Sequence, residues 1–315
     1  MNKEKLDIVV PVYNEEESIE ELLKRLFVLK EKMNFLDINF IFINDGSKDR
    51  TLEILNKYAQ QNNFVKIINF SRNFGHQFAL TAGVDHSEAD FVAIIDADLQ
   101  DPPELIEDMY NEAKKGCDIV YGKRLERKGE TIFKKITAKC FYKFMRMMVD
   151  VDIPADTGDF RLINNKVLNY LKQMQEKHRF IRGMVPWIGF NSTPLYYNRD
   201  IRYAGETKYP LNKMLKFALD AIFSFSNKPL KLANHIGFFA IFIGVFGSFL
   251  MLYFFFFTDF KVPGITTTIL TILIMGGIQI LMLGIIGEYI GRIFEEVKAR
   301  PLYVIESTKN FIKRG

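Results

Sequence analysis

Residues 91–101, FVAIIDADLQD, contain the most informative pattern of the chain. Its five apolar residues predict a short buried strand, and polar residues follow this strand directly. Side chains at positions i and i+2 of an extended segment point to the same side, so Asp96, Asp98 and Gln100 share one face. These oxygen ligands suit a hard divalent cation that also holds phosphate oxygens. The alternative is that the acids only cap the helix that the following prolines begin.

Strand and helix signals alternate on both sides of this stretch. Strands are predicted at residues 7–12, 38–43, 65–70, 91–95 and 118–121. Helices are predicted at residues 15–32, 49–61 and 103–115, and another begins at His76. The alternation predicts an α/β fold with a mostly parallel, Rossmann-like sheet flanked by helices. Ligands of such sheets bind outside the carboxyl ends of the strands, where the polar residues of this chain stand.

Two more polar motifs follow predicted strands. PVYNEE at residues 11–16 ends the first strand, and NDGS at residues 44–47 ends the second. An acid in this position can accept hydrogen bonds from ribose hydroxyls or from a base N–H group. Each motif alone is also typical of an ordinary turn between a strand and a helix. Their convergence with residues 96–100 on one sheet edge indicates a nucleotide site.

The composition excludes several classes of protein. A length of 315 residues suits one large domain or two smaller ones, and a formal net charge of +4 is too balanced for a general nucleic-acid binder. Two cysteines exclude a disulfide framework and a four-cysteine zinc site, and the four histidines lack metal-ligand spacing. The first residues do not form a signal peptide, because their apolar run is short and acids follow it.

Two uncharged stretches near the C-terminus, about 236–258 and 262–287, predict a transmembrane hairpin. As helices each would extend about 34–39 Å, enough to cross a hydrocarbon core of about 30 Å. The alternative is a buried pair of core helices. The basic residues on the outer flanks are Lys228, Lys231, Arg292, Lys298 and Arg300, whereas the turn has only Lys261. The positive-inside rule then predicts a multi-pass protein of the cell membrane with both termini in the cytoplasm.

Two basic amphipathic stretches, residues 132–148 and 211–227, precede the hairpin. They are either surface helices packed on their own domain or helices that lie in the bilayer interface. A neighbouring membrane anchor favours the second interpretation.

The motifs together resemble a known family. Residues 11–16, 44–47 and 96–104 resemble the signature blocks of family 2 glycosyltransferases with the GT-A fold. Three further motifs and the hairpin resemble those of the polyprenyl-phosphate glycosyltransferases. This group includes bactoprenol glucosyltransferase and dolichol-phosphate mannose synthase. These motifs are TGDFRL at 157–162, AGETKYP at 204–210 and GEYIGR at 287–292. The resemblance covers nearly the whole chain.

The resemblance implies a domain division and a set of site residues. Residues 1–210 would form a cytoplasmic GT-A catalytic domain, 211–230 an interfacial helix, 231–292 the hairpin and 293–315 a cytoplasmic tail. The implied residues are Pro11, Tyr13, Glu15, Asp45 and Asp96 for the nucleotide sugar, Asp96, Asp98 and Gln100 for Mg²⁺ or Mn²⁺, Arg124 and Lys208 for the acceptor phosphate, and Asp159 for catalysis. One position departs from the pattern, because His76 stands where the group has a Lys after Asn-Phe-Gly.

The implied reaction is an inverting transfer of one sugar to polyprenyl (undecaprenyl) phosphate at the cytoplasmic membrane face, for modification of a cell-surface glycan or the cell wall. UDP-glucose, UDP-galactose and UDP-N-acetylglucosamine all stay open as donors. The acceptor phosphate is already mostly a dianion near neutral pH, so Asp159 either orients the attack and stabilises charge or acts as a base. The structural alternative for Asp159 is a turn acid paired with Arg161.

Two other functions are weighed against this one. A processive polysaccharide synthase needs a translocation channel, and the only tryptophan, Trp187, lacks the Gln-x-x-Arg-Trp pattern of such enzymes. A membrane protein that only binds nucleotide sugars would not need intact acids at Asp96, Asp98 and Asp159. The expected partners are the donor, the acceptor and the bilayer but no nucleic acid, and the resemblance leaves room for a flippase and a downstream glycosyltransferase. Close helix contacts in a homo-oligomer are allowed by Gly276, Gly277, Gly284 and Gly287.

Overall fold

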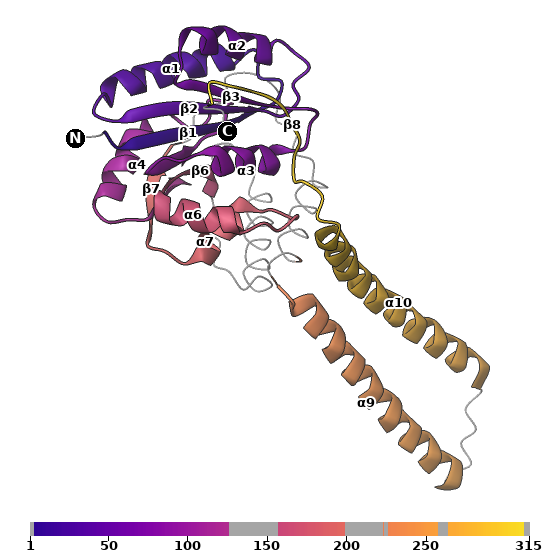
Figure 1. The fold of residues 1–315 in the computed structure, drawn as a ribbon. Coiled ribbons are helices and arrows are strands. Elements are labelled where there is room, and N and C mark those ends of the chain that lie inside the picture. Colours follow the sequence, from indigo (N-terminus) through magenta and orange to yellow (C-terminus); the bar gives the residue numbers. More distant parts are fainter. Residues whose placement is uncertain (1–2, 126–156, 199–222, 224–225, 258–263, 312–315) are drawn as a thin grey trace. The chain divides into compact units, whose positions relative to one another are not determined.

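The computed structural model describes residues 3–125, 157–198, 223, 226–257 and 264–311, and the chain divides into two compact units. The first unit contains the described strands (Figure 1). They are β1 (Lys5–Val12), β2 (Asp37–Asn44), β3 (Val65–Phe70), β4 (Phe91–Ile94), β5 (Ile119–Arg124), β6 (Thr157–Asn164), β7 (Ser192–Tyr197) and β8 (Ile305–Lys309).

These strands form one sheet in the order β7-β5-β6-β4-β1-β2-β3-β8. The four central strands β4, β1, β2 and β3 are parallel, and β5 pairs in parallel with β7. Strand β6 is antiparallel to both β4 and β5, and β8 is antiparallel to β3. The prediction of a mostly parallel sheet flanked by helices is therefore confirmed.

Helices cover both faces of the sheet, which explains why its central strands are apolar without alternation. The helices are α1 (Ile19–Lys32), α2 (Thr51–Gln61), α3 (His76–His86), α4 (Leu105–Lys114), α6 (Asn165–Gln173) and α7 (Ile181–Ile188). Ile8 and Val10 of β1 belong to the cluster formed with α1, α2 and α4. Val9 faces α3, where a Cβ on Gly83 would lie 2.3 Å from its Cγ1 atom. The glycine thus lets α3 approach the sheet closely.

The second unit contains two long apolar helices, α9 (Lys228–Phe257) and α10 (Gly264–Val297), which contact one another. Lys228–Leu250 and Thr271–Val297 are long and apolar enough to cross a membrane. At most 6% of either apolar window is buried, so the alternative of a buried pair of core helices does not fit. The helices extend beyond the predicted spans, to Lys228 at one end and to Val297 at the other.

Within the predicted tail at 293–315, residues 305–309 form β8 in the sheet of the first unit. Strand β8 pairs with β3 and forms the edge of the sheet, and Tyr303 stacks on Phe70 with ring centroids 5.0 Å apart. The Tyr303 hydroxyl donates a hydrogen bond of 3.0 Å to Asp85. The β8 sequence, IESTK, has no apolar run, so the pairing depends on backbone hydrogen bonds that composition does not reveal.

Candidate active site

The beginning of β6 lies beside the carboxyl ends of β4 and β5. This arrangement brings the residues of the site together. Ile94 of β4 pairs with Arg161 of β6, and Lys123 of β5 pairs with Thr157. Because β6 is antiparallel to both neighbours, its first residues lie beside the residues that follow β4. Asp159 and the acidic segment 96–101 are thereby brought to one edge of the sheet.

Asp159 is a fully buried acid of this edge, and an arginine holds it. The Arg182 guanidinium donates to both carboxylate oxygens, from Nε at 2.9 Å and from Nη2 at 2.8 Å. His76 Nε2 lies 3.1 Å from the Asp159 Oδ2 atom. Burial alone would raise the pKa of Asp159, but Arg182 and His76 hold it well below its usual value.

The guanidinium of Arg161 does not pair with the Asp159 carboxylate, contrary to the structural alternative weighed from the sequence. It donates instead to backbone carbonyls, with Nε 3.2 Å from the Asp159 oxygen and Nη2 3.0 Å from the Gly158 oxygen. Burial lowers the pKa of Arg161 to about 10. Arg161 therefore binds the backbone at the beginning of β6, whereas Arg182 supplies the counter-charge.

His76 begins α3 and lies between two acids. Its Nε2 atom is 3.5 Å from the Asp96 Oδ1 atom in addition to the contact with Asp159. Burial favours the neutral ring, but the hydrogen bond to Asp159 and the charge of Asp96 raise the pKa of His76 to about 9. Part of the ring stays open to solvent, because 44% of the side chain is exposed. The residue that departs from the family pattern thus stands in the middle of the acidic cluster.

Asp96 carries the features of a cation ligand. Its Oδ1 atom is buried and has no hydrogen-bond partner among the described residues. The pKa of Asp96 is raised to about 6, mainly by burial; the charge of His76 opposes the shift, and the nearby carboxylates of Asp159, Asp101 and Asp98 add to it. A carboxylate cluster of this kind gains stability from a cation.

The cluster could hold a divalent metal ion. Ligand atoms of His76, Asp96 and Asp159 lie within 4.8 Å of one another. Both oxygens of Asp159 already accept hydrogen bonds from Arg182, so Asp96 has more capacity left for a metal. Of the other predicted ligands, Asp98 accepts a hydrogen bond of 3.1 Å from the Gln100 backbone N–H. This bond closes the turn that follows β4 and keeps residues 98–100 beside Asp96.

Arg124 ends β5 beside a second buried acid, Asp101. Its Nη2 atom lies 3.8 Å from the Asp101 Oδ1 atom, which also accepts a hydrogen bond from the Tyr197 hydroxyl. Arg124 Nε is 3.5 Å from the same hydroxyl. A Cβ on Gly158 would lie 2.9 Å from Arg124 Nη2, so the glycine leaves room for the guanidinium. Arg124 is thus held next to the acidic cluster.

The two predicted nucleotide loops, residues 11–16 and 44–47, interlock, because the Asn14 backbone N–H donates a 3.0 Å hydrogen bond to the Ser47 hydroxyl. Pro11 is buried at the end of β1. Tyr13, two residues further along, has 42% of its side chain exposed. The Glu15 backbone N–H donates a 2.9 Å hydrogen bond to the Thr51 hydroxyl, and its carboxylate accepts one of 2.7 Å from the Ser18 hydroxyl. These contacts explain why α1 begins at Ile19 and not at residue 15 as predicted.

Asp45 binds the chain itself. Its two carboxylate oxygens accept hydrogen bonds from the backbone N–H groups of Phe74 at 2.6 Å and Gly75 at 2.9 Å. Burial raises the pKa of Asp45 although these two donors oppose the shift. Asp45 therefore fixes the turn that presents His76 to the acidic cluster.

The structure brings most of the predicted residues to one edge and adds several that the sequence analysis missed. Lys208 and the stretch 132–148 lie outside the described residues, as does nearly all of 211–227. The missed residues are the contacts of the predicted ones, namely Arg182, Asp101 and Tyr197. For Arg182 no signal was available, because it stands in an ordinary helix far along the chain from Asp159.

The chain is similar to known proteins over nearly its whole length. Residues 7–171 match the family model of glycosyl transferase family 2, and residues 228–293 match that of the GtrB C-terminal hairpin. The glycosyltransferase YkcC of Bacillus subtilis (strain 168) is 52% identical over 303 residues, covering 96% of this chain and 93% of the relative. The prophage bactoprenol glucosyl transferase homolog of Escherichia coli (strain K12) is 38% identical over 306 residues, covering 97% and 99%. Among solved structures, glucosyl-3-phosphoglycerate synthase from Mycobacterium tuberculosis matches with a TM-score of 0.45 and 17% identity, over 70% of this chain and 78% of that chain.

Proposed function

Since the chain belongs to glycosyl transferase family 2, we propose that this glycosyltransferase moves one sugar from a nucleotide sugar to a polyprenyl phosphate. The observation that carries the proposal is the buried acidic cluster at the end of β4, with Arg124 beside it. The relatives named bactoprenol glucosyl transferases and the matching hairpin support a lipid-linked acceptor. The donor that we expect is UDP-linked, with UDP-glucose first among the candidates.

The donor half of the site is assigned to the interlocked loops and the acidic segment. We assign the nucleoside to Pro11, Tyr13 and Glu15, where the exposed Tyr13 ring can pack on a base. Asp45 would contribute through the turn that it holds in addition to any direct contact. The diphosphate belongs beside Asp96, where Asp98 and Gln100 complete the ligand set for Mg²⁺ or Mn²⁺. When bound, this cation would neutralise the departing diphosphate.

The acceptor half is assigned to Arg124 and Asp159. The Arg124 guanidinium can bind a phosphate in a bidentate manner, and Asp101 and Tyr197 keep it oriented. Asp159 is held as a carboxylate by Arg182, so it can stabilise positive charge that develops on the sugar. A group with a strongly lowered pKa is a poor base, which favours the orienting role for Asp159 over proton abstraction. Lys208 stays a further predicted phosphate ligand.

The proposed reaction is a single displacement at the anomeric carbon. A phosphate oxygen of the acceptor forms the new bond to this carbon, and the bond to the diphosphate oxygen of the donor breaks. The products are the polyprenyl-phosphate sugar and the nucleoside diphosphate, and the anomeric configuration inverts. No proton has to be removed from a dianionic phosphate.

The hairpin would hold this site at the membrane. The hydrocarbon tail of a polyprenyl phosphate stays in the bilayer, so the enzyme must meet its phosphate at the surface. We propose that both ends of the hairpin and the first unit are cytoplasmic, where nucleotide sugars are made. The basic residues on the outer flanks of the spans support this orientation.

A panel of labelled nucleotide sugars tests the proposal. The full chain in membranes receives polyprenyl phosphate and each donor, and thin-layer chromatography separates the lipid products. We expect one donor to give a lipid with a single sugar. Arg124→Ala should reduce acceptor use by about tenfold or more, whereas the matched variant Lys123→Ala, which removes the neighbouring charge, should change it little. Growing polymer chains, or no lipid product with any donor, would contradict the proposal.

A further inference from the structure

A directed chain of hydrogen bonds connects the C-terminal strand with the loops of the proposed nucleotide site. Asn69 Nδ2 donates a hydrogen bond of 2.8 Å to the carboxylate of Glu306, and Asn44 Nδ2 donates one of 2.7 Å to Asn69 Oδ1. The Ser47 backbone N–H then donates to Asn44 Oδ1 at 3.4 Å. The Asn14 backbone N–H donates to the Ser47 hydroxyl at 3.0 Å. Every donor in this chain points toward Glu306.

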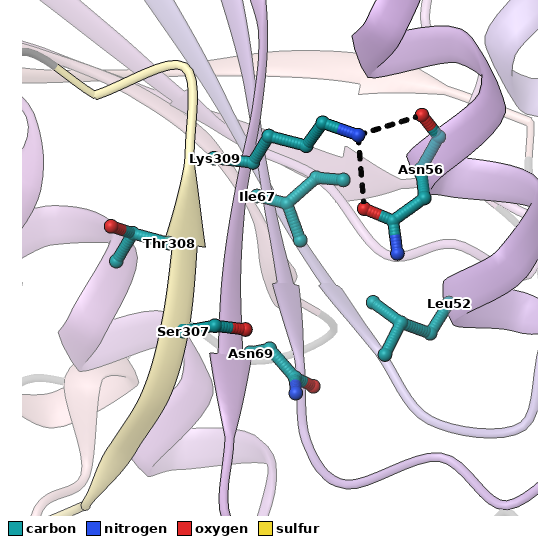
Figure 2. A pocket seen from close by; sticks show the side chains of 7 residues that line it. All are labelled: Leu52, Asn56, Ile67, Asn69, Ser307, Thr308 and Lys309. Atoms are coloured by element: carbon teal, nitrogen blue, oxygen red, sulfur yellow. Dashed lines mark hydrogen bonds between the residues drawn. The ribbon is translucent and has the colours of Figure 1, made fainter.

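A β-bulge aims Glu306 at this chain. Asn69 pairs with Ser307, but the next residue of β3, Phe70, pairs with Ile305, so Glu306 is the extra residue of β8. A bulge breaks the strict alternation of side chains and redirects the extra residue. Figure 2 shows that the side chains of Asn69 and Ser307 come from the two paired strands near α2, whereas Thr308 points away from them.

The carboxylate at the end decides the orientation of both amides. A carboxylate only accepts hydrogen bonds, so Asn69 must turn its NH₂ group toward Glu306 and its oxygen toward Asn44. Asn44 must then turn its NH₂ group toward Asn69 and its oxygen toward the Ser47 N–H. Asn44 and Asn69 are buried, so water cannot easily correct a wrong orientation.

We propose that Glu306 is a positioning residue for nucleotide binding. Its carboxylate orients Asn69 and Asn44, and through them it holds residues 44–47 and 11–16 in the geometry that receives a nucleoside diphosphate. This inference rests on the proposed function for the identity of the ligand. It assigns to the strand that follows the hairpin a part in the donor site, which the predicted tail did not have.

Three variants of the full chain test the relay. Glu306→Gln keeps an acceptor oxygen but can also donate, so its UDP affinity should lie between those of the wild type and Glu306→Met. Glu306→Met has a similar length but accepts no hydrogen bond, so it should release both amides. Thr308→Val is the matched control, since it changes an exposed side chain of the same strand that points away from Asn69.

Two measurements are made on each variant. Calorimetry gives the dissociation constant for UDP, and hydrogen exchange with mass spectrometry reports the backbone amides of residues 44–51. For Glu306→Met we expect UDP affinity to fall about fivefold, with faster exchange at residues 44–51 and unchanged exchange at residues 65–70. Turnover at saturating donor should stay near that of the wild type, because the variant acts on binding.

The outcomes separate the relay from the proposed function. Unchanged exchange at residues 44–51 in Glu306→Met would overturn the relay. A UDP affinity of Glu306→Gln as low as that of Glu306→Met would also overturn it. If Glu306→Met also exchanges faster along β3 and β8, Glu306 only stabilises the contact between these two strands. This result would overturn the relay too. If the wild type binds no UDP but Glu306→Met still loosens residues 44–51 alone, the relay stands and the UDP-linked donor is wrong.

Discussion

Replacement of Arg182 by methionine should unfold the site around Asp159 at a lower temperature. The variant keeps most of the apolar stem of the side chain and removes both hydrogen bonds to the carboxylate. Asp159 exposes only 1% of its side chain, so water cannot replace the lost partner. His76 remains as the second partner at 3.1 Å.

The expected cost follows from these contacts. Removal of one partner from a buried ion pair costs about 3–5 kcal/mol. Arg182 is 28% exposed and His76 still faces the carboxylate, so the low end, about 3 kcal/mol, applies. In a unit of this size that loss lowers the melting temperature by about 6–12 °C.

Thermal unfolding of the purified chain in detergent measures this effect, with two comparison variants. Arg182→Lys keeps the charge but loses the fork geometry, so it should lie between the wild type and Arg182→Met. The double variant Arg182→Met/Asp159→Asn has no unpaired charge and should regain most of the lost stability without regaining transfer. A melting temperature of Arg182→Met within about 2 °C of the wild type would refute the assignment of Arg182 as the counter-charge.

The pH dependence gives an independent check on the same pair. In the wild type the folded pKa of Asp159 is lowered, so the pair stabilises the fold above the ordinary pKa of an aspartate and loses this contribution as pH falls toward the lowered value. In Arg182→Met burial dominates and raises the pKa, so protonation relieves the penalty. The difference in melting temperature between the two proteins should therefore shrink from about pH 8 to about pH 5.

Three further predictions concern the metal, the acceptor and the topology. Asp98→Asn should abolish transfer and leave the melting temperature within about 2 °C, a chelator should reproduce the loss in the wild type, and undiminished turnover in excess chelator would exclude the metal role. Gly158→Ala places a Cβ 2.9 Å from the Arg124 guanidinium, so the KM for polyprenyl phosphate should rise while UDP affinity stays unchanged by calorimetry. In a background without native cysteines, Asp259→Cys should react with an impermeant thiol reagent in intact cells and Gln60→Cys should not, and the reverse labelling would place the first unit outside the cell.

The class of fold and the sheet edge that carries the site could both be predicted from the amino-acid sequence. The strands that contain Ile8, Phe42 and Ile94 read as apolar runs because both faces of a parallel sheet are covered. Parallel strands direct their carboxyl ends to one edge, so the motifs that follow them had to converge. The two uncharged stretches likewise predicted long apolar helices from length and composition alone.

The identity of the groups that meet at that edge depends on the tertiary fold. His76, Asp159 and Arg182 come from α3, β6 and α7, and no local period relates them. Their contact depends on the antiparallel insertion of β6 between β4 and β5, which the strand pattern did not indicate. The pairing of β8 with β3, and the bulge that directs Glu306 toward Asn69, could not be predicted for the same physical reason. Hydropathy periods report how a segment faces its surroundings, whereas contacts between distant segments depend on strand order and register, which the whole chain decides together.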